Sequence, residues 1–477
     1  ATNLDPFFLA PDALRALFCR SLQRADREQG GELLALLEGN RGLFDGLDVE
    51  GSCSTAELAR ILGCPIVLSL NCTKMTRTAA ALIQGVMRFE PGLVFAGVVL
   101  NQVGSVRHER LLRRVLEAHT DMPVLGALPR LAENPLPERH MGIASSGCSL
   151  AADAAARLES LADQVRQHID LDAVLAAAHA APDMAIPDSL PDSLSCSPAS
   201  PPASSLSSSQ SDTLSLSAEA PAGNGIWLTS PDMQPAHSPT VAPRPRIGYV
   251  RDAALWFYYE DNLAALEDAG AALVRLRIIG EGADSPEAAA CWESLDGLYL
   301  GGGFPEDCAP ALSRSPRLAQ RARLAGRGLL VYAECGGFML LAQGIERDAV
   351  VWPMSGIFPV TACFSPKPQG LGYVAGTVQQ ETPFFPVGLE LRGHEFHYSH
   401  CRWQGAPPPG ALRLRRGQGM GRMGQCGPSE RADGLVRGRV WAAYTHIFAP
   451  AVPCWAPNFV AVAGRYRQER EARCVFR

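Results

Sequence analysis

The fold follows from one stretch of the sequence, Leu329–Leu330–Val331–Tyr332–Ala333–Glu334–Cys335–Gly336–Gly337–Phe338. Its apolar first half is typical of a buried strand, and the two glycines lead into the helix-like run Phe338–Met339–Leu340–Leu341. A tight turn between a strand and a helix pushes its side chain out of the sheet edge. Unpaired N–H groups at the start of a helix stabilise negative charge, which favours the thiolate of Cys335. We therefore predict that Cys335 is a nucleophile, and the alternative is a buried structural thiol.

The composition is that of a globular protein with more than one domain. The 477 residues suffice for two or three domains, 47% of them are hydrophobic, and no run of about 18 apolar residues predicts a membrane span. The net charge of −6 provides no basic field for nucleic acid. The 14 cysteines form no C-x-x-C pair and no zinc-ligand cluster with histidine, which favours a reducing cytosol. We predict a cytoplasmic protein without nucleic-acid or membrane partners.

The first half alternates strand-like with helix-like segments, which predicts a doubly wound, mostly parallel sheet. The expected strands cover residues 33–37, 65–70, 94–100 and 123–128. Ligands of such α/β sheets bind at the carboxyl ends of the strands. Glu38, Asp45 and Asn101 fall at or just past these ends, so we expect them to serve ATP or the substrate, with Glu38 holding Mg²⁺. The alternative for each is a solvated loop residue.

The composition divides the chain into three parts. An alanine-rich, helix-like segment over residues 149–180 closes the first part, and Ser, Pro, Asp and Ala then dominate up to Pro245. Because such a composition offers too little apolar surface to offset chain entropy, we predict a disordered linker. The expected parts are a first α/β domain over residues 1–181, a linker over 182–245 and a second α/β domain over 246–465.

A second glycine turn accompanies the cysteine turn in the second domain. The strand-like run 297–300 leads into Gly301, Gly302 and Gly303, which leave bare backbone N–H groups at a strand end. Such groups suit the binding of an oxyanion, and a plain tight turn is the alternative. Because both turns follow neighbouring strands of one predicted sheet, we expect the glycines and the thiol to act together.

A thiol nucleophile needs a base, and the histidines of the second domain are the candidates. His446 comes just past the strand-like run 440–444, where the catalytic groups of α/β folds collect. His394 and His397 lie in a segment that alternates like a strand, so we expect them on opposite faces. We predict that His446 is the base and keep a structural histidine as the alternative.

Motifs from both halves occur in the order known from one enzyme family. In the second half they are Arg251–Ala254 with Phe257–Tyr259, Gly297–Glu306, Tyr332–Gly337, Leu391–Ser399 and Tyr444–His446. In the first half they are Asn3–Phe7, Glu38–Gly46 and Ser54–Ala56. With these motifs the sequence resembles the cobyrinic acid a,c-diamide synthases in every part except the linker.

The resemblance implies the roles of both domains. The first would resemble dethiobiotin synthetase, a P-loop-type domain that uses Mg²⁺ and ATP to activate substrate carboxylates, and the second a class I glutamine amidotransferase. By motif position Cys335 matches the family nucleophile and His446 the residue that raises its nucleophilicity. Gly336 would join the glycine turn in binding glutamine or its oxyanion. Ordinary triad amidotransferases carry a glutamate two residues after the histidine, where this chain has Phe448, as the dyad pattern of the family allows.

The implied reaction is ATP-dependent, glutamine-hydrolysing amidation of the a and c acetate carboxylates of cobyrinic acid in cobalamin biosynthesis. The partners would be glutamine, ATP and a corrin-type tetrapyrrole, and the quaternary state that we expect is a homodimer. Two alternatives stay open. One is amidation of hydrogenobyrinic acid or nickel-sirohydrochlorin, and the other is a glutaminase or scaffold protein with an inactive ATP domain.

One motif of the family is missing from this sequence. Family members begin with a glycine-rich phosphate loop of the form G-x-x-x-x-G-K-S/T, which occurs nowhere in these 477 residues. Lys74 does not replace it, because Lys74 follows Asn71–Cys72–Thr73 and not a glycine loop. Since the sequence also begins without methionine, we expect it to be N-terminally incomplete.

Overall fold

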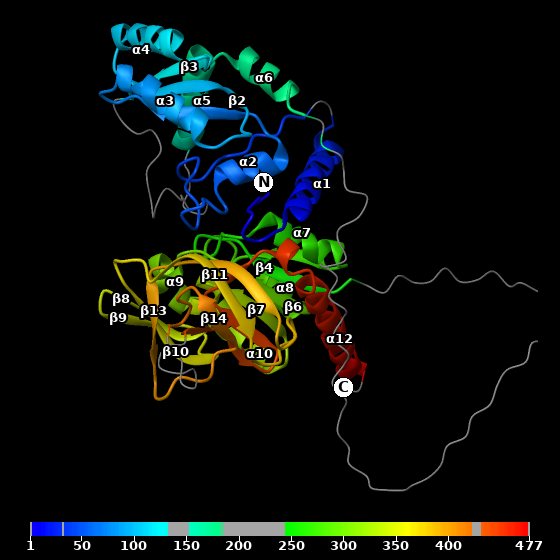
Figure 1. Cartoon of the computed structure of the whole chain (residues 1–477). Coiled ribbons are helices and arrows are strands. Elements are labelled where there is room, and N and C mark those ends of the chain that lie inside the picture. Colours follow the sequence, from blue (N-terminus) through cyan, green and yellow to red (C-terminus); the bar gives the residue numbers. More distant parts are fainter. Residues whose placement is uncertain are drawn as a thin grey trace, which may run out of the picture.

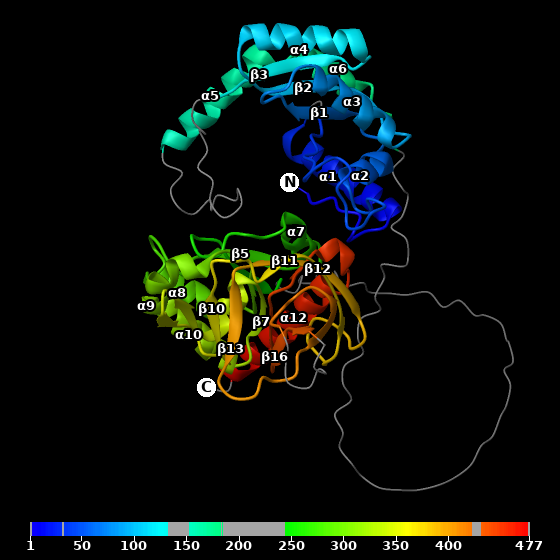
Figure 2. The same cartoon turned by 60° about the vertical axis from the view of Figure 1, so that its left-hand side comes forward.

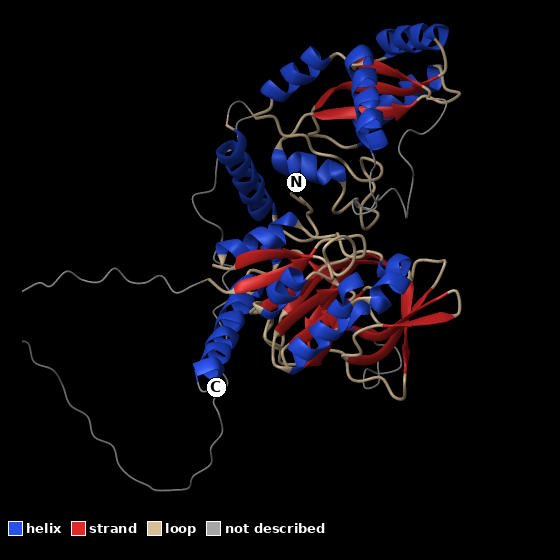
Figure 3. Cartoon of the chain, turned by 180° about the vertical axis from the view of Figure 1, so that it is seen from behind, coloured by secondary structure: helices blue, strands red, loops and turns tan. Residues whose placement is uncertain are grey.

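The computed structural model describes residues 2–30, 33–131, 152–182, 184, 244–421 and 431–475. The predicted linker over 182–245 therefore falls almost entirely outside the described residues. The strands gather in two groups, and the helices of the N-terminal segment lie between these groups (Figure 3). In the described ranges no helix is both long and apolar enough to cross a membrane.

The first sheet contains three parallel strands in the order β1-β2-β3 (Figure 1). The strands are β1 (Ile66–Asn71), β2 (Phe95–Val103) and β3 (Val124–Pro129). The helices of this region are α3 (Arg77–Phe89), α4 (Val106–His119), α5 (Ala152–His168) and α6 (Leu171–His179). Ile83 of α3 and Leu112 of α4 pack with Val98 of β2 in one buried cluster. The predicted alternation of parallel strands with helices is confirmed for these elements.

The predicted strand over residues 33–37 is wrong. Residues 33–40 form no regular structure, and the side chains of Leu34 and Leu36 are 48% and 91% exposed. A strand requires a neighbour that supplies its ladder of hydrogen bonds, and within this sheet β1 pairs with β2 alone. An apolar run in a sequence does not reveal whether such a neighbour exists. Glu38 is consequently an exposed residue of an irregular segment and not the end of a strand.

Asp45 and Asn101 also differ from their predicted positions at strand ends. Because β2 continues to Val103, Asn101 lies inside the strand, opposite Asn71 of β1. Asp45 belongs to a turn, where its carboxylate accepts a hydrogen bond from the N–H of Gly42 at 3.1 Å. The predicted cluster at the carboxyl ends of the first sheet is therefore not formed by these side chains.

Two helices of the N-terminal segment lie between the first sheet and the second domain (Figure 2). They are α1 (Pro11–Gln29), which was not predicted from the sequence, and α2 (Thr55–Leu62). The start of α2 is encoded locally, because the hydroxyl of Ser54 accepts a hydrogen bond from the N–H of Glu57 at 3.2 Å. The carboxylate of Glu57 in turn accepts one from the N–H of Cys53. Such an exchange satisfies N–H groups that a helix start leaves free.

The N-terminal segment is bonded to the second domain. The hydroxyl of Tyr373 donates a hydrogen bond to the carboxylate of Asp5 at 2.7 Å, and the guanidinium of Arg392 donates one to the carbonyl of Phe7 at 2.8 Å. The rings of Phe7 and Tyr373 stack with their centres 4.2 Å apart. These contacts fix the N-terminal segment beside the second domain.

The second domain is built on a six-stranded sheet in the order β5-β4-β6-β7-β17-β16, parallel except at β16. Its strands are β4 (Arg246–Val250), β5 (Ala272–Leu276), β6 (Gly297–Leu300), β7 (Leu330–Glu334), β16 (Leu435–Arg437) and β17 (Val440–Ala443). Alternate residues of these strands enter two separate buried cores, with Tyr332 in one and Val331 and Ala333 in the other. Both faces of the sheet are thus covered, which explains why its strands read as continuous apolar runs.

Helices contribute to both cores of this sheet. One core includes residues of α8 (Pro286–Glu293), α9 (Ala309–Arg314), α10 (Pro316–Gly326) and α11 (Gly336–Leu341). The other includes residues of α7 (Glu260–Asp268) and α12 (Trp455–Val475). The predicted mostly parallel α/β arrangement of this half is confirmed.

Two further sheets of the second domain were not predicted. A four-stranded sheet contains β8 (Ala342–Arg347), β9 (Val350–Pro353), β10 (Phe358–Phe364) and β13 (Ser399–Trp403). A five-stranded antiparallel sheet contains β11 (Gly370–Val378), β12 (Glu390–His397), β14 (Leu412–Arg416), β15 (Arg431–Asp433) and β18 (His446–Ile447). The second sheet carries His394 and His446 as directly opposite residues of β12 and β18.

Candidate active site

Cys335 stands at the sharp turn between β7 and α11, as the sequence predicts. Its backbone has a φ of +48°, which is uncommon for a residue with a Cβ atom and costs on the order of 1–3 kcal/mol. The turn is held from both sides, because the N–H of Cys335 donates to the carbonyl of Ala443 at 2.8 Å. Its carbonyl accepts from the N–H of Met339 at 3.1 Å. The surrounding structure therefore fixes the thiol in one place.

The predicted glycine turn after β6 touches the cysteine turn. The N–H of Gly337 donates to the carbonyl of Gly301 at 2.9 Å, and a Cβ atom on Gly336 would lie 3.0 Å from the backbone N of Gly303. Side chains at these positions would separate the two turns. The structure thus brings together the glycines and the thiol that the sequence predicted to act together.

The N–H groups of the glycine turn are not equivalent. Gly301 donates to the hydroxyl of Tyr258 at 2.9 Å, and Gly302 donates to the carbonyl of Phe257 at 3.0 Å. Gly303 has no hydrogen-bond acceptor for its N–H in the part of the chain that the structure describes. Of the three glycines in this turn, Gly303 is therefore the one whose N–H remains available.

His446 is buried on β18 with its ring between two other side chains. Its Nδ1 lies 3.6 Å from the Oε2 of Glu334, and its ring stacks on that of His394 with centres 4.7 Å apart and planes 12° apart. A Cβ atom on Gly302 would lie 2.5 Å from Cε1 of this ring. The imidazole is thus held against the glycine turn and beside a carboxylate.

His394 has a different environment from that of His446. Its Nδ1 lies 3.0 Å from the hydroxyl of Tyr259. Burial, reinforced by the charge of His446, holds the pKa of His394 well below its ordinary value, so that His394 stays neutral. Since His446 faces a carboxylate, the geometry favours His446 over His394 as the base.

The thiol itself is neutral at rest, which contradicts the expectation that the helix start favours the thiolate. Cys335 is only 4% exposed, and burial raises the pKa of its thiol far above the ordinary value. The negative charges of Glu306 and Glu334 act in the same direction, against a hydrogen bond from the N–H of Gly336. Desolvation outweighs the dipole of a helix with only six residues. A base must therefore remove the proton before the sulfur can attack.

A cavity of about 730 Å³ joins this site to the N-terminal segment. Cys335, His446 and Gly303 line one part of it, and Glu38 and Asp45 line another. Asn101 is not among its lining residues. The structure thus brings four of the predicted catalytic and ATP-domain residues, together with Gly303, to one cavity and leaves Asn101 apart.

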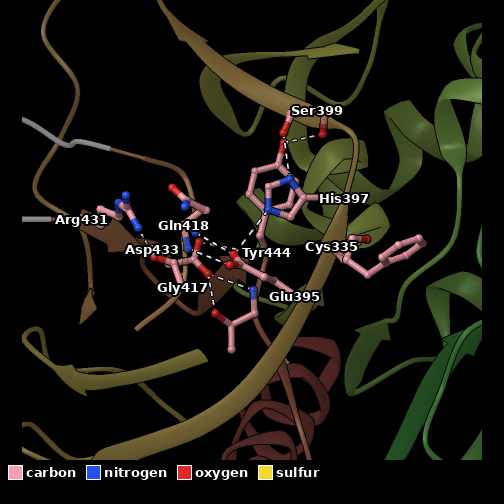
Figure 4. A network of polar contacts seen from close by, with 12 residues as sticks. Cys335, Glu395, His397, Ser399, Gly417, Gln418, Arg431, Asp433 and Tyr444 are labelled. Atoms are coloured by element: carbon pink, nitrogen blue, oxygen red, sulfur yellow. Dashed lines mark hydrogen bonds and ion pairs between the residues drawn. The ribbon is translucent and has the colours of Figure 1, made fainter. Parts of the chain in front are cut away.

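His397 belongs to a polar network with Glu395, Ser399 and Tyr444 (Figure 4). Because side chains alternate along a strand, His397 lies on the opposite face of β12 from His394, three residues before it. Its Nδ1 lies 2.8 Å from the carbonyl of Ser399, its Nε2 lies 3.5 Å from Glu395, and its ring stacks on Tyr444 with centres 3.8 Å apart. The carboxylate of Glu395 accepts hydrogen bonds from the N–H groups of residues 418 and 419 at 2.6 and 2.7 Å. These contacts indicate a structural role for His397, which packs with Tyr444 and Glu395 in the core near Cys335.

Several residues around the base were not singled out from the sequence. They are Glu334, Tyr299, Asn262 and Asp433, all buried and all hydrogen-bonded to one another or to the backbone around His446. One signal could have found the first of them, since a charged residue closing an otherwise apolar strand, directly before a nucleophile, is unusual in a core.

The described residues do not provide a complete magnesium site. No group of three or more His, Cys, Asp or Glu side chains within them could hold a metal ion. Glu38 therefore belongs to no such group among the described residues, and its predicted role as a metal ligand stays a prediction. We therefore derive no catalytic step through Mg²⁺.

Two family models match the chain. The CobQ/CobB/MinD/ParA nucleotide binding domain matches residues 31–143, and the CobB/CobQ-like glutamine amidotransferase domain matches residues 246–452. Curated relatives match nearly the whole chain. A cobyrinate a,c-diamide synthase of Magnetococcus marinus is 33% identical over 98% of this chain and 86% of its own length. The chain belongs to the cobyrinate a,c-diamide synthase family.

Further members of the cobyrinate a,c-diamide synthase family match equally broadly. The protein of Syntrophotalea carbinolica is 34% identical over 96% of this chain and 86% of its own length, and that of Dehalococcoides mccartyi strain 195 is 33% identical over 97% and 86%. The two matched domains make the chain a glutamine-dependent amidating ligase that uses ATP. The exact domain boundaries stay predictions.

Proposed function

We propose that this chain amidates the a and c acetate carboxylates of cobyrinic acid, with glutamine as nitrogen donor and ATP as activating agent. The main support for this proposal is the cavity that joins the buried thiol to the loop of residues 34–50 in the first domain, which carries Glu38 and Asp45 and is called the acidic loop below. The relatives named above are cobyrinate a,c-diamide synthases, which supports a corrin as the substrate. We keep Mg²⁺ as the expected companion of ATP and a homodimer as the expected quaternary state.

The proposed reaction begins at Cys335. His446 takes the proton from the neutral thiol, and the sulfur then attacks the side-chain amide carbon of glutamine. The negative charge that develops on the amide oxygen is stabilised by the N–H groups of Gly303 and Gly336, which lie at the contact between the two turns. The protonated His446 returns the proton to the departing nitrogen, so that ammonia leaves and a thioester remains. Water hydrolyses the thioester to glutamate and restores the thiol.

The second half of the reaction uses the ammonia at the other end of the cavity. ATP phosphorylates a carboxylate of the corrin, and ammonia displaces the phosphate to form the amide. Ammonia must remain unprotonated on the way, because ammonium has no lone pair with which to attack. Transfer through the cavity, rather than through bulk water, meets this requirement. Glu38 and Asp45, which line the first-domain part of the cavity, are the proposed ATP or substrate residues.

The variant Cys335→Ala tests whether glutamine hydrolysis belongs to the second domain and amidation of the corrin to the first. We expect glutamate release to fall by about 10⁴-fold or more, because the nucleophile is lost. Amidation of cobyrinic acid with ATP and added ammonium should continue, because the first domain does not need the thiol. Both activities are followed by glutamate assay and by mass spectrometry of the corrin. Hydrogenobyrinic acid and nickel-sirohydrochlorin serve as alternative acceptors in the same assay.

The matched control for this variant is Cys363→Ala. Cys363 lies on β10 of the same domain and is buried to the same extent as Cys335. We expect both activities of this control to stay close to those of the unchanged protein. Loss of ammonium-dependent amidation in Cys335→Ala, with a folded protein, would contradict the proposed division of labour.

A further inference from the structure

The carboxylate expected for a triad amidotransferase is absent from its usual position. Two residues after His446, the chain has Phe448, which is fully buried and packs against Phe8 of the N-terminal segment. A base that becomes positively charged in a buried site still needs a counter-charge and a fixed ring orientation. The neutral ring of His394, stacked on His446, supplies neither. Another group must therefore do so.

Glu334 occupies the required place from a different strand. It is the last residue of β7, directly before the nucleophile, and is 2% exposed. Its Oε2 lies 3.6 Å from Nδ1 of His446 and accepts a hydrogen bond from the hydroxyl of Tyr299 at 2.8 Å. Its Oε1 accepts hydrogen bonds from the hydroxyl of Tyr332 at 3.2 Å and from the N–H of Ile447 at 3.0 Å. The carboxylate is thus held in one orientation by three donors and by the ring.

We propose that Glu334 is the positioning residue that orients His446 and stabilises its protonated form during glutamine hydrolysis, in place of the missing triad carboxylate. This inference rests on the proposed glutaminase function of the same site. Glu334 does not take the proton. The proton passes from the thiol to His446 and from there to the leaving ammonia, while Glu334 faces the Nδ1 side of the ring throughout. The other nitrogen, Nε2, is then left to exchange the proton with sulfur and ammonia.

A second set of contacts fixes the strand that carries the base. The side-chain amide of Asn262 donates hydrogen bonds to the hydroxyl of Tyr299 at 3.1 Å and to the carbonyl of Ile447 at 2.9 Å. Its oxygen accepts one from the N–H of Ala449 at 2.7 Å. Asn262 therefore connects the tyrosine that holds Glu334 with the backbone on both sides of Phe448. The carboxylate and the base are positioned by one continuous network.

The titratable groups around His446 come from several elements. Glu334 faces its ring from β7, His394 faces it from β12, and Cys335 lines the same cavity at the turn. Tyr299 and Tyr332 face Glu334, and burial keeps the pKa of both phenols well above the ordinary value, so they remain donors. Among the described residues, Glu334 is thus the one carboxylate that contacts this ring.

Asp433 is a second buried carboxylate near the base, but its hydrogen bonds go to Gly434 and to the two residues before His446, not to the ring. It accepts hydrogen bonds from the N–H groups of Tyr444 and Thr445 at 3.1 and 2.8 Å and from the hydroxyl of Thr445 at 2.6 Å. Its role is therefore to fix the backbone. Asp433→Asn is the matched control for a carboxylate that supports the site without facing the ring.

The test is the pH dependence of glutaminase activity in Glu334→Gln, which keeps the shape of the side chain and removes its charge. We expect kcat to fall by about 100-fold or more, with KM changed by less than about threefold. The low-pH limb of kcat/KM should move to lower pH by about one unit, because protonated His446 loses its counter-charge. Amidation with added ammonium should be unchanged, which also shows that the protein is folded.

Tyr299→Phe is a second variant, for which we expect the low-pH limb of kcat/KM to move in the opposite direction. Without the hydroxyl, more of the negative charge on Oε2 acts on His446, so the low-pH limb should move to higher pH. Tyr332→Phe, which removes a donor to the other oxygen, should move it less. An unchanged limb in both Glu334→Gln and Tyr299→Phe would overturn the inference, as would an equal shift in Asp433→Asn. If the unchanged protein itself releases no glutamate, the proposed function fails instead.

Discussion

The thiol site and the acidic loop of the first domain line the same cavity but are built in opposite ways. Every residue from Leu330 to Leu341 is buried, and the turn at Cys335 is bonded to neighbouring strands on both sides. Most residues from Leu34 to Glu50 are exposed, and the hydrogen bonds of this loop are local, either within the loop, as between Gly42 and Asp45, or to the nearby start of α2, as between Leu43 and Ala56. The fold alone thus preorganises glutamine hydrolysis, whereas we expect ATP and the corrin to contribute to the order of the acidic loop.

Apart from the Cys335 and Glu334 variants above, the largest effect that separates the two regions should come from Gly302→Ala. The added methyl group would lie 2.5 Å from Cε1 of His446 and must displace the ring. A displacement of about 1 Å at a reacting group costs about 100-fold in rate, so we expect a loss of that size in kcat for glutamine hydrolysis. Steady-state glutaminase assays measure it.

The control for this substitution is Gly85→Ala in α3 of the first domain. No atom lies within 4 Å of a Cβ atom at this position, and alanine favours a helix over glycine by about 1 kcal/mol. We expect slightly higher thermal stability and unchanged glutaminase activity. Equal glutaminase rates for Gly302→Ala and the unchanged protein would show that the site is less tightly built than the structure indicates.

A second prediction concerns Glu306, a buried residue beside the preorganised site. In the described part of the chain its Oε2 has no hydrogen-bond partner, and burial raises the pKa of the carboxyl from 4.5 to about 7. The folded state therefore keeps a proton that the unfolded state loses. The stabilisation is fully present below pH 4.5 and is lost as the pH rises through about 7. The loss amounts to about 3 kcal/mol in the free energy of unfolding.

Glu306→Gln should remove this pH dependence. We expect the variant to gain stability over the unchanged protein at pH 8 but not at pH 4.5, as measured by chemical unfolding at both values. The control is Glu287→Gln at an exposed position of α8, which should leave the pH dependence of the free energy of unfolding unchanged. A parallel pH profile for Glu306→Gln and the unchanged protein would mean that Glu306 is ionised in the folded state.

The smallest effect is expected in the acidic loop. Because Glu38 and Asp45 line the cavity from an exposed segment, we expect Glu38→Ala and Asp45→Ala each to lower ATP-dependent amidation by about tenfold. Glutamine hydrolysis should persist in both. Glu50→Ala, in the same loop but not lining the cavity, serves as control. Full amidation activity in both cavity variants would exclude these residues from the ATP and substrate site.

The sequence predicted a strand correctly where the apolar pattern of a segment is matched in the fold by neighbouring strands that pair with it. The strand, turn and helix around Cys335 were recognisable, because a continuous apolar run that ends at Cys-Gly-Gly is typical of a buried strand that stops abruptly. The position of His446 just past β17 was also predicted, and its role as the base stays a prediction. The same reasoning failed at residues 33–37, because an apolar run says nothing of whether another strand lies beside it.

The role of Glu334 could not be read from its position in the sequence. A charged residue after four buried strand residues is an unusual feature that marks Glu334, but the sequence does not show what it contacts, because its partner His446 is more than a hundred residues away. The parallel pairing of β7 with β17 brings the two together. The four-stranded and five-stranded sheets escaped prediction for a similar reason, since pairs such as β10 with β13 and β12 with β18 join strands that are distant in the sequence.

The most direct test of the account follows the nitrogen from the thiol site to the corrin. The unchanged protein is given ATP, cobyrinic acid and glutamine labelled with ¹⁵N in its side-chain amide, in the presence of unlabelled ammonium. Mass spectrometry then measures the isotope in the corrin. Because one cavity joins the two sites, we predict a diamide that carries ¹⁵N at both positions. A product with unlabelled nitrogen, or glutamate without any amidated corrin, would contradict the claim that the two domains share one reaction path.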